Sequence, residues 1–312
     1  MKLKEKLTNV VFVRRCYAWC YDSFFKTLAL ISPRLFYVVK CRFSALRRWP
    51  DLKSPRIFAE KMIWLTVNWR HPMKSQCADK YAVREYVKKC GCEDLLTPLI
   101  GVWNRVEDID FDVLPQRFAL KCNHGCGCNI ICKDKTRLDL EDAKKKLRRW
   151  MKRDYGRYSG EIHYSGIKPR IICEEYLEDG DNLMPIDYKF FMLSGRPYFC
   201  LVISDRKPGI VGHVRYHYYD PNWKRVRNVL RDARMDSDIS ETEKPACYEK
   251  MLAAAVKLAK PFPFVRVDFY SINGRAYFGE LTFTPAGGLE DKWTDEVQER
   301  LGALITLPSP IR

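Results

Sequence analysis

Two carboxylates on either side of a predicted turn are the residues of this chain best suited to metal chemistry. Apolar and polar residues alternate through 265–283, on both sides of Asn273-Gly274, as expected for two strands with one buried face. Asn-Gly strongly favours a tight hairpin turn. The hairpin would place Asp268 and Glu280 on one face, where two carboxylates can share a hard divalent cation such as Mg2+. An exposed hairpin with solvated acids is the alternative.

A glycine-containing loop is the second stretch whose residue types indicate chemistry. The loop NHGCGCN (123–129) lies between predicted strands at 118–122 and 130–132. Glycines let backbone N–H groups approach phosphate oxygens closely, and Lys121 on the preceding strand adds a positive charge. No Gly-Lys-Ser/Thr opens a helix here, so this is not a Walker loop. The pattern predicts a hairpin that grips phosphate.

Zinc binding is the competing interpretation of the same loop. The available soft ligands are Cys122, His124, Cys126, Cys128 and Cys132. They include no C-x2-C pair, and the glycines would serve no purpose in a metal knot. The default interpretation is therefore thiols in the core and the loop. The chain has thirteen cysteines, but it is not a small secreted domain with a cleavable signal, so we expect reduced thiols in a cytoplasmic protein.

Helices and strands with clear periodicity surround these two stretches. At 312 residues the chain can form two or three packed units. Region 205–231 is expected to be irregular or to form short strands. Helices are predicted over 56–69, 79–89, 139–154 and 245–260. Further strands are predicted over 95–102, 170–177, 188–192 and 197–203.

The charge of the chain is strongly positive and concentrated at one end. The formal net charge is +16, and residues 1–49 hold eleven Lys/Arg against two acids, or +9. Anionic partners are therefore expected. Region 10–43 is aromatic, apolar and basic, which suits either a membrane-surface helix or a helical pair packed on the main body. No run approaches the roughly 18 apolar residues that a membrane span needs.

The order of these parts resembles the ATP-grasp fold, in particular its TupA-like branch, which is associated with teichuronopeptide and other bacterial surface polysaccharides. The resemblance extends over about 56–308. It is carried by the motifs DKYAVREYV (79–87), FALKCNHGCG (118–127), IKPRIICEEYL (167–177), DYKFFMLSGRP (187–197) and VRVDFYSINGRAYFGELTFTP (265–285).

The resemblance implies an α+β fold in which two α+β subdomains grip a nucleotide, with the glycine loop as a lid over the phosphates. Four segments follow from it: a basic aromatic helical extension (1–55), the first part of the grasp module (56–115), a lid subdomain (116–172) and a C-terminal subdomain with the metal site (173–312).

The same resemblance implies a set of ATP-binding residues. Lys80 and Lys121 match phosphate-binding lysines, and Lys189 is a further candidate for the phosphates and for catalysis. The lid would contribute His124, Gly125 and Gly127. The hinge that meets the adenine would be Glu174, Glu175, Tyr176 and Leu177, with Asp181 reaching the ribose.

For the metal and the reacting groups, Asp268 and Glu280 match the magnesium ligands. Arg266 matches the arginine that steadies negative charge on the reacting acyl group. Thr282 stands where many family members have Asn, and a hydroxyl is a poorer metal ligand than a carbonyl oxygen. The lid has Cys126 and Cys128 where Ser or Gly is commoner, which is tolerable because backbone N–H groups do most of the gripping.

The implied activity is that of an ATP- and Mg2+-dependent carboxylate–amine ligase. It would join an amino acid or amino sugar to a uronic acid or similar acid of a surface polysaccharide or its precursor. Arg206, His213, Arg215 and His217 are the candidates for the acceptor pocket. The expected location is cytoplasmic, and residues 1–47 would allow peripheral attachment to the inner face of the bacterial membrane.

Two other classes of function remain open. A glycosyltransferase-like enzyme of the same pathway would also need a metal and a basic pocket for its nucleotide sugar. A non-enzymatic binding protein for nucleic acid or an anionic membrane would explain the +16 charge but gives no reason for Asp268, Glu280 and the glycine loop. Nucleic acid is therefore not expected as a partner.

Overall fold

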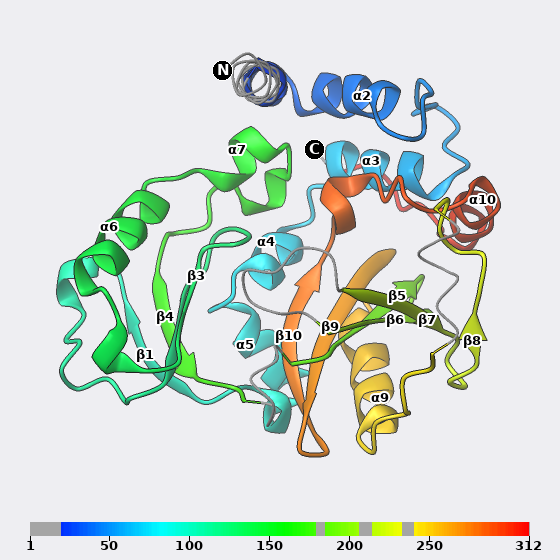
Figure 1. Ribbon diagram of the computed structural model, residues 1–312. Helices are drawn as coiled ribbons and strands as arrows, with labels where there is room; N and C mark the ends of the chain where they lie inside the picture. Colours follow the sequence, from blue (N-terminus) through cyan, green and yellow to red (C-terminus); the bar gives the residue numbers. More distant parts are fainter. Residues whose placement is uncertain (1–19, 179–184, 206–213, 233–239, 312) are drawn as a thin grey trace, which may run out of the picture.

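Two antiparallel sheets make up the body of the protein (Figure 1). The computed structural model describes residues 20–178, 185–205, 214–232 and 240–311. The four-stranded sheet has the order β1-β4-β2-β3 and comprises β1 (Leu99–Trp103), β2 (Phe118–Cys122), β3 (Asn129–Cys132) and β4 (Ile171–Glu175). The six-stranded sheet has the order β10-β9-β5-β6-β7-β8 and comprises β5 (Asp187–Leu193), β6 (Arg196–Ser204), β7 (Arg215–Tyr219), β8 (Arg225–Val226), β9 (Phe264–Ile272) and β10 (Arg275–Thr282).

Helix α6 (Leu140–Met151) covers the outer face of the four-stranded sheet (Figure 1). Asp139 caps it by accepting a hydrogen bond from the backbone N–H of Asp142 at 2.9 Å, which satisfies one of the free donors of the first turn. The polar faces of α6 stay in solvent, while Ala143 and Leu147 are buried against the sheet. The short helix α7 (Tyr155–Ser159) follows and leads the chain back into β4.

Both faces of the six-stranded sheet are buried, because adjacent residues of a strand point to opposite faces. On β5, Phe190 packs on Tyr248 of α9 (Tyr248–Ala259), with ring centroids 5.6 Å apart. Its neighbour Phe191 packs on Trp293, at 5.2 Å. Trp293 is fully buried and joins the sheet to α3 (Phe58–Asn68), through Phe58 at 4.9 Å, and to α10 (Asp295–Leu304).

Helices α4 (Pro72–Ala78) and α5 (Val83–Lys89) lie between the two sheets (Figure 1). The turn between them is held by Asp79, whose Oδ1 accepts from the backbone N–H groups of Tyr81 and Ala82 at 2.8 and 3.1 Å. This turn also bonds to the four-stranded sheet, since the N–H of Lys80 donates to the carbonyl of Asn123 at 3.2 Å.

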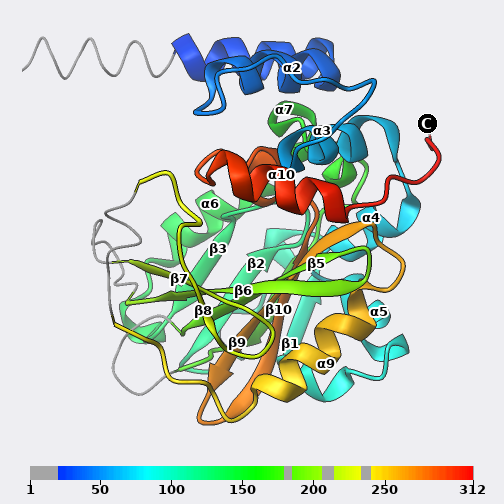
Figure 2. The same ribbon diagram turned by 90° about the vertical axis from the view of Figure 1, so that its right-hand side faces the viewer.

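The N-terminal part forms a helical layer over α3 and α7 (Figures 1 and 2). Residues 20–31 are helical, and α2 (Pro33–Phe43) begins after Ser32, which caps it. Phe36 and Tyr37 are buried with Ile63 of α3 in a core of their own. The sequence left two interpretations of region 10–43 open, a membrane-surface helix and a helical pair packed on the main body. From residue 20 on, the structure shows two helices packed on the body. No helix among the described residues has the length and apolarity that crossing a bilayer requires.

Most predicted elements form within a few residues of their expected bounds, and β2 forms at 118–122 as expected. Two expectations about organisation differ from the structure. The boundary at 172/173 falls inside β4, and β1, from the expected segment 56–115, joins the sheet of the lid because it pairs with β4. Helix α10 was not predicted from the sequence. The α+β class is confirmed.

Candidate active site

A cavity of about 520 Å³ lies between the two sheets. Its lining includes nine residues that the sequence singled out, drawn from both sheets and from the turn before α5. They are Lys80, Lys121, Glu174, Glu175, Tyr176, Leu177, Lys189, Asp268 and Glu280. Residues that are up to 200 positions apart in the chain therefore share one cleft, as the resemblance implied.

One wall of the cavity carries a row of charged side chains across three strands. Lys189 on β5 is the register partner of Asp268 on β9, and Asp268 is the partner of Glu280 on β10. A bulge at Gly279 brings Glu280 into this position. A Cβ on Gly279 would lie 3.0 Å from the carbonyl oxygen of Asp268, so the close approach of the two strands favours glycine here.

Asp268 is held by two cations. Its carboxylate accepts from Arg266 at 2.7 Å (Nε) and 2.6 Å (Nη2), and from Lys189 Nζ at 2.6 Å. The side chain is only 3% exposed. Burial by itself would raise the pKa of Asp268, but the Arg266 guanidinium and the Lys189 ammonium outweigh it and hold that pKa below the usual range. Asp268 is thus a fixed carboxylate, which orients both cations.

Glu280 is the less neutralised member of the row. Its side chain is 38% exposed and accepts a hydrogen bond from the Thr282 hydroxyl at 3.1 Å, while Arg266 Nη2 lies 3.6 Å away. Thr282 in turn accepts from Arg266 at 3.0 Å. The hydroxyl therefore links the arginine to the carboxylate, although Thr282 and Arg266 are not among the residues that line the cavity.

The donors of this wall fit Mg2+ by their chemistry, because carboxylate and hydroxyl oxygens are the hard ligands that this cation prefers. Glu280 is the accessible donor, and Asp268 and Thr282 lie next to it. Asp268 would have to exchange part of its contact with Arg266 or Lys189 for the ion. The described part of the chain holds no cluster of three or more His, Cys, Asp or Glu side chains arranged for a metal, so the zinc interpretation of the glycine loop has no support in these residues.

The opposite wall is basic. Glu174 on β4 is 8% exposed and is clamped by two cations, with Lys121 Nζ at 2.7 Å and Arg84 Nη1 at 2.9 Å. Lys80 Nζ donates to the carbonyl of Gly125 at 2.6 Å, which ties it to the glycine loop. Lys133, after β3, also lines this wall. The cations converge where an anionic ligand between the sheets would lie.

His124 and the two glycines of the loop lie beside the cavity and do not line it. His124 is 5% exposed, with Nε2 at 3.2 Å from the carbonyl of Trp150 and Nδ1 at 3.3 Å from Asn123. Burial lowers the pKa of His124. Gly127 has φ +72°, a conformation that favours glycine, and Gly125 packs against Tyr155 of α7. His124, Gly125 and Gly127 are not part of the cavity lining, and their phosphate-binding role stays a prediction.

Sequence reasoning missed several residues of the cavity. Arg84, Tyr270, Phe278 and Ile131 line it together with the hinge residues. Phe278 and Ile131 supply apolar surface suited to the flat base of a nucleotide. Arg84 belongs to the motif DKYAVREYV, which could have drawn attention to it. Its contact with Glu174, 90 residues away in the sequence, could not be predicted from that motif.

Five predicted residues lie away from the cavity or outside the described residues. Asp181, Arg206 and His213 belong to the latter group. On β7, Nε of Arg215 forms an ion pair with Asp205 at 2.8 Å. His217 is 2% exposed, and its Nδ1 lies 3.2 Å from the hydroxyl of Thr242. Neither lines the cavity between the sheets, and their acceptor role stays a prediction.

The loop that follows β10 connects this site to the N-terminal layer. Thr284 donates a hydrogen bond to Glu161, a carboxylate that is 8% exposed. Burial raises the pKa of Glu161, although Thr284 and Tyr155 both donate to it. Lys40 of α2 lies 3.5 Å from the carbonyl of Gly287 in the same loop. Helix α2 therefore packs on the segment that directly follows the candidate metal ligands.

Two facing antiparallel sheets with a charged cleft between them and a glycine-loop hairpin on one side define an ATP-grasp protein. A sequence profile of the TupA-like ATP-grasp family matches residues 60–306, and the chain belongs to this family. The fold and the family expected from the motifs are thus confirmed. No curated protein sequence matches the chain.

Solved structures with a related fold share little sequence with the chain. An L-amino acid ligase from Bacillus licheniformis has 14% identity and a TM-score of 0.47, covering 76% of this chain and 51% of its own. A D-alanine–D-alanine ligase from Bacillus anthracis, complexed with ATP, has 16% identity and a TM-score of 0.45, covering 75% and 66%. D-cycloserine synthetase DcsG has 13% identity and a TM-score of 0.43, covering 75% and 70%. The chain thus spans between half and two thirds of the first two ligases.

Proposed function

We propose that the protein is an ATP-dependent carboxylate–amine ligase. The observation that carries this proposal is that one cavity has an acidic wall and a basic wall. Lys189, Asp268 and Glu280 form a row on the first, and Lys80 and Lys121 lie on the second. Such a cleft suits a polyphosphate together with a divalent cation. An amide-forming ligase needs both, because its first step brings two anions together.

In the first step, an oxygen of the substrate carboxylate attacks the γ-phosphorus of ATP. The bond from that phosphorus to the bridging oxygen of ADP breaks, leaving an acyl phosphate and ADP. Lys80, Lys121 and Lys189 would neutralise the phosphate oxygens and orient them. Mg2+ held by Glu280, Asp268 and Thr282 would supply further charge neutralisation.

In the second step, the nitrogen of an amine attacks the acyl carbon. The nitrogen gives up one proton, phosphate leaves with the bonding electrons of the acyl–oxygen bond and takes up that proton, and an amide forms. Arg266 would stabilise the oxyanion that develops on the acyl oxygen. Asp268 would hold Arg266 in place through its two hydrogen bonds.

The substrates that we propose are an amino acid or amino sugar as the amine and a uronic acid or similar anionic sugar as the acid, in a bacterial surface polysaccharide or its precursor. Two features support this choice: the family to which the chain belongs and a net charge of +16, which favours anionic ligands. A cytoplasmic location follows from the use of ATP.

Nucleotide binding is the first test. The thermal midpoint would be measured with ATP, ADP, GTP and UDP-glucuronate, each with and without Mg2+. A ligand at about 100 times its Kd adds about 2.7 kcal/mol to the free energy of unfolding, so Mg-ATP and Mg-ADP should raise the midpoint clearly. Stabilisation by the UDP-sugar alone would instead support a transferase.

The chemistry can be tested before the amine is known. Hydroxylamine traps acyl phosphates as hydroxamates, so a panel of uronic acids with Mg-ATP and hydroxylamine should give hydroxamate and ADP in equal amounts. The Glu280→Gln variant is the matched control and should form neither. ADP release without hydroxamate for every acid would contradict an acyl phosphate mechanism.

A further inference from the structure

The N-terminal layer exposes an unusually large share of apolar side chains. Thirteen large hydrophobic side chains are exposed in the described part of the protein. Seven of them fall within residues 20–49: Tyr21, Phe24, Leu30, Ile31, Leu35, Phe43 and Trp49. Ile31, Phe43 and Trp49 are 71%, 66% and 61% exposed. Thirty residues therefore carry about half of the large apolar side chains that are exposed among the described residues, which is a mark of an interaction surface.

The same surface is basic. Residues 20–49 contain six Lys or Arg and one acid, Asp22, and Asp22 forms an ion pair with Lys26. Arg34, Arg42 and Arg47 are exposed. Arginine next to aromatic and aliphatic side chains is typical of helices that lie at the boundary of lipid headgroups and acyl chains. A nucleic acid would match the charge but leave the aliphatic side chains in water.

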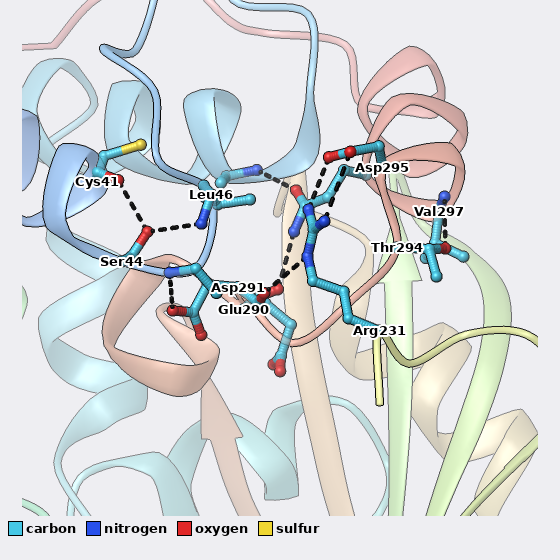
Figure 3. Close-up of polar contacts among 12 residues, drawn as sticks. Cys41, Ser44, Leu46, Arg231, Glu290, Asp291, Thr294, Asp295 and Val297 are labelled. Atoms are coloured by element: carbon cyan, nitrogen blue, oxygen red, sulfur yellow. Dashed lines mark hydrogen bonds and ion pairs between the residues drawn. The ribbon is translucent and has the colours of Figure 1, made fainter. Parts of the chain in front are cut away.

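The inner side of this layer is firmly attached to the catalytic half of the protein. The backbone N–H of Ala45 donates to Asp291 at 3.0 Å, and the hydroxyl of Ser44 donates to the carbonyl of Cys41 at 2.8 Å, which closes the end of α2 (Figure 3). Tyr37 is fully buried, and a Cβ on Gly288 would lie 3.0 Å from its ring. The exposed face thus has a set orientation relative to the loop that follows β10.

We propose that residues 20–49 dock the protein on an anionic lipid surface, with the apolar side chains in the acyl boundary and the arginines at the headgroups. This segment lies outside residues 60–306, which match the family model. If the proposed ligase function holds, the docked enzyme turns the loop that follows β10, on which α2 packs, toward the membrane, which suits an acceptor sugar carried on a lipid.

The test uses the full-length protein and sedimentation with vesicles, without nucleotide. Vesicles containing phosphatidylglycerol should bind the protein, and vesicles of phosphatidylcholine alone should bind it much more weakly. An arginine near an anionic surface contributes roughly five-fold to partitioning, so the variant Arg34→Gln/Arg42→Gln/Arg47→Gln should bind about 100-fold more weakly. Its matched control is Lys145→Gln/Arg149→Gln/Lys152→Gln on and after α6, where the residues are also exposed.

A second variant tests the apolar part of the surface. Phe24→Ser/Phe43→Ser/Trp49→Ser should weaken binding at high salt, where the arginines contribute least. The control is Val113→Ser/Leu304→Ser, which changes side chains that are 75% and 46% exposed elsewhere. Both sets alter exposed positions, and unchanged thermal midpoints would show that the variants fold.

Several results would overturn the proposal. Equal binding to anionic and neutral vesicles would do so, as would arginine variants that bind like their controls. A dimer in sedimentation equilibrium that the apolar variant disperses would mean that a second copy covers this face. RNA binding that depends on the same arginines, without vesicle binding, would identify a nucleic-acid surface. Stabilisation by Mg-ATP is measured separately, so failure of membrane docking and failure of the ligase proposal can be told apart.

Discussion

The two walls of the cavity carry opposite charge. On the side of the four-stranded sheet, the lining has four cations, Lys80, Arg84, Lys121 and Lys133, against Glu174 and Glu175. On the side of the six-stranded sheet it has Lys189 against Asp268 and Glu280. The first wall is therefore net positive and the second net negative. A cleft of this kind favours an anion and a cation bound together over either alone.

The two walls also share one arrangement of charged side chains. Each holds one nearly buried carboxylate between an arginine and a lysine: Glu174 with Arg84 and Lys121, and Asp268 with Arg266 and Lys189. The difference lies in the more exposed acid of each wall: Glu280 is the register partner of the clamped Asp268 on the next strand, whereas Glu175 follows Glu174 along the same strand. This contrast indicates that the clamped carboxylates orient cations, whereas Glu280 is the group left for a metal.

Loss of the clamped carboxylate on the acidic wall should have the largest effect. Asp268→Ala leaves Arg266 and Lys189 as buried charges without their partner, and breaking a buried ion pair in this way costs about 3–5 kcal/mol. We therefore expect a large fall in the free energy of unfolding as well as loss of activity, measured by chemical denaturation. Asp94→Ala, which breaks an exposed pair with Lys250, should cost about 1 kcal/mol or less.

The pH dependence of this variant has a definite sign. The pKa of Asp268 is lower in the folded protein than in the unfolded chain, so its stabilising contribution is present above the unfolded pKa of about 3.9 and is lost as the pH falls through the folded value. The gap between wild type and Asp268→Ala should stay constant from about pH 5 to 8. If the difference in the free energy of unfolding already vanished at about pH 6, the pKa of Asp268 would not be lowered in the folded protein.

Glu280→Gln should separate catalysis from stability. The side chain is 38% exposed, so the thermal midpoint should change little. Loss of one metal-binding carboxylate should lower Mg2+-dependent ADP release by about 100-fold or more, the size found when one transition-state contact is removed. Glu299→Gln, an exposed change on α10, should leave the rate unaltered. Full turnover in Glu280→Gln would remove the distinction between the two walls.

Lys121→Met tests the basic wall and should have a smaller effect. A charged hydrogen bond contributes about 1.5–3 kcal/mol, so we expect ATP to bind about 10-fold to 100-fold more weakly by calorimetry. The loss should be similar with and without Mg2+, unlike that of Glu280→Gln, which should appear only with the metal. Lys145→Met on α6 is the control. A loss of ATP affinity in Lys121→Met that appears only with Mg2+ would contradict the distinction between the two walls.

The smallest effect is expected for Glu290, a further carboxylate near Arg266. Burial raises the pKa of Glu290 from 4.5 to about 7, and its carboxylate has no partner among the residues drawn in Figure 3. A raised folded pKa lowers stability above the unfolded value, with the full cost reached above about pH 7. Glu290→Gln should therefore stabilise the protein by about 1 kcal/mol at pH 8 and hardly at pH 5.

Denaturation of Glu290→Gln at the two pH values measures this difference, with Glu299→Gln as the control. The expected gain is smaller than the full linkage value because the Glu290 side chain is only partly buried and solvent screens its charge. A stabilisation that is equal at pH 5 and pH 8 would show that Glu290 is not the group that titrates.

Local parts of the site could be predicted from the sequence because they depend on neighbours along the chain. Asn273 and Gly274 both adopt positive φ, at 50° and 74°, as the hairpin turn requires. That turn sets the register as far as the pair Phe269 and Phe278, but the bulge at Gly279, which the turn does not specify, is what places Glu280 opposite Asp268. The compact run FALKC before the glycine loop likewise predicted β2 at its observed bounds, and with it the position of Lys121.

Only the tertiary structure decided which distant charges meet. Lys189 reaches Asp268 because β5 pairs with β9, across 79 positions of sequence, and Arg84 reaches Glu174 because α5 packs beside β4. Pairing of distant strands depends on how whole faces bury their apolar side chains, and periodicity within one strand contains no record of its partner. The sequence thus determined the strands, the turn and the candidate ligands, while packing of the two sheets decided that one carboxylate is clamped and the other left open.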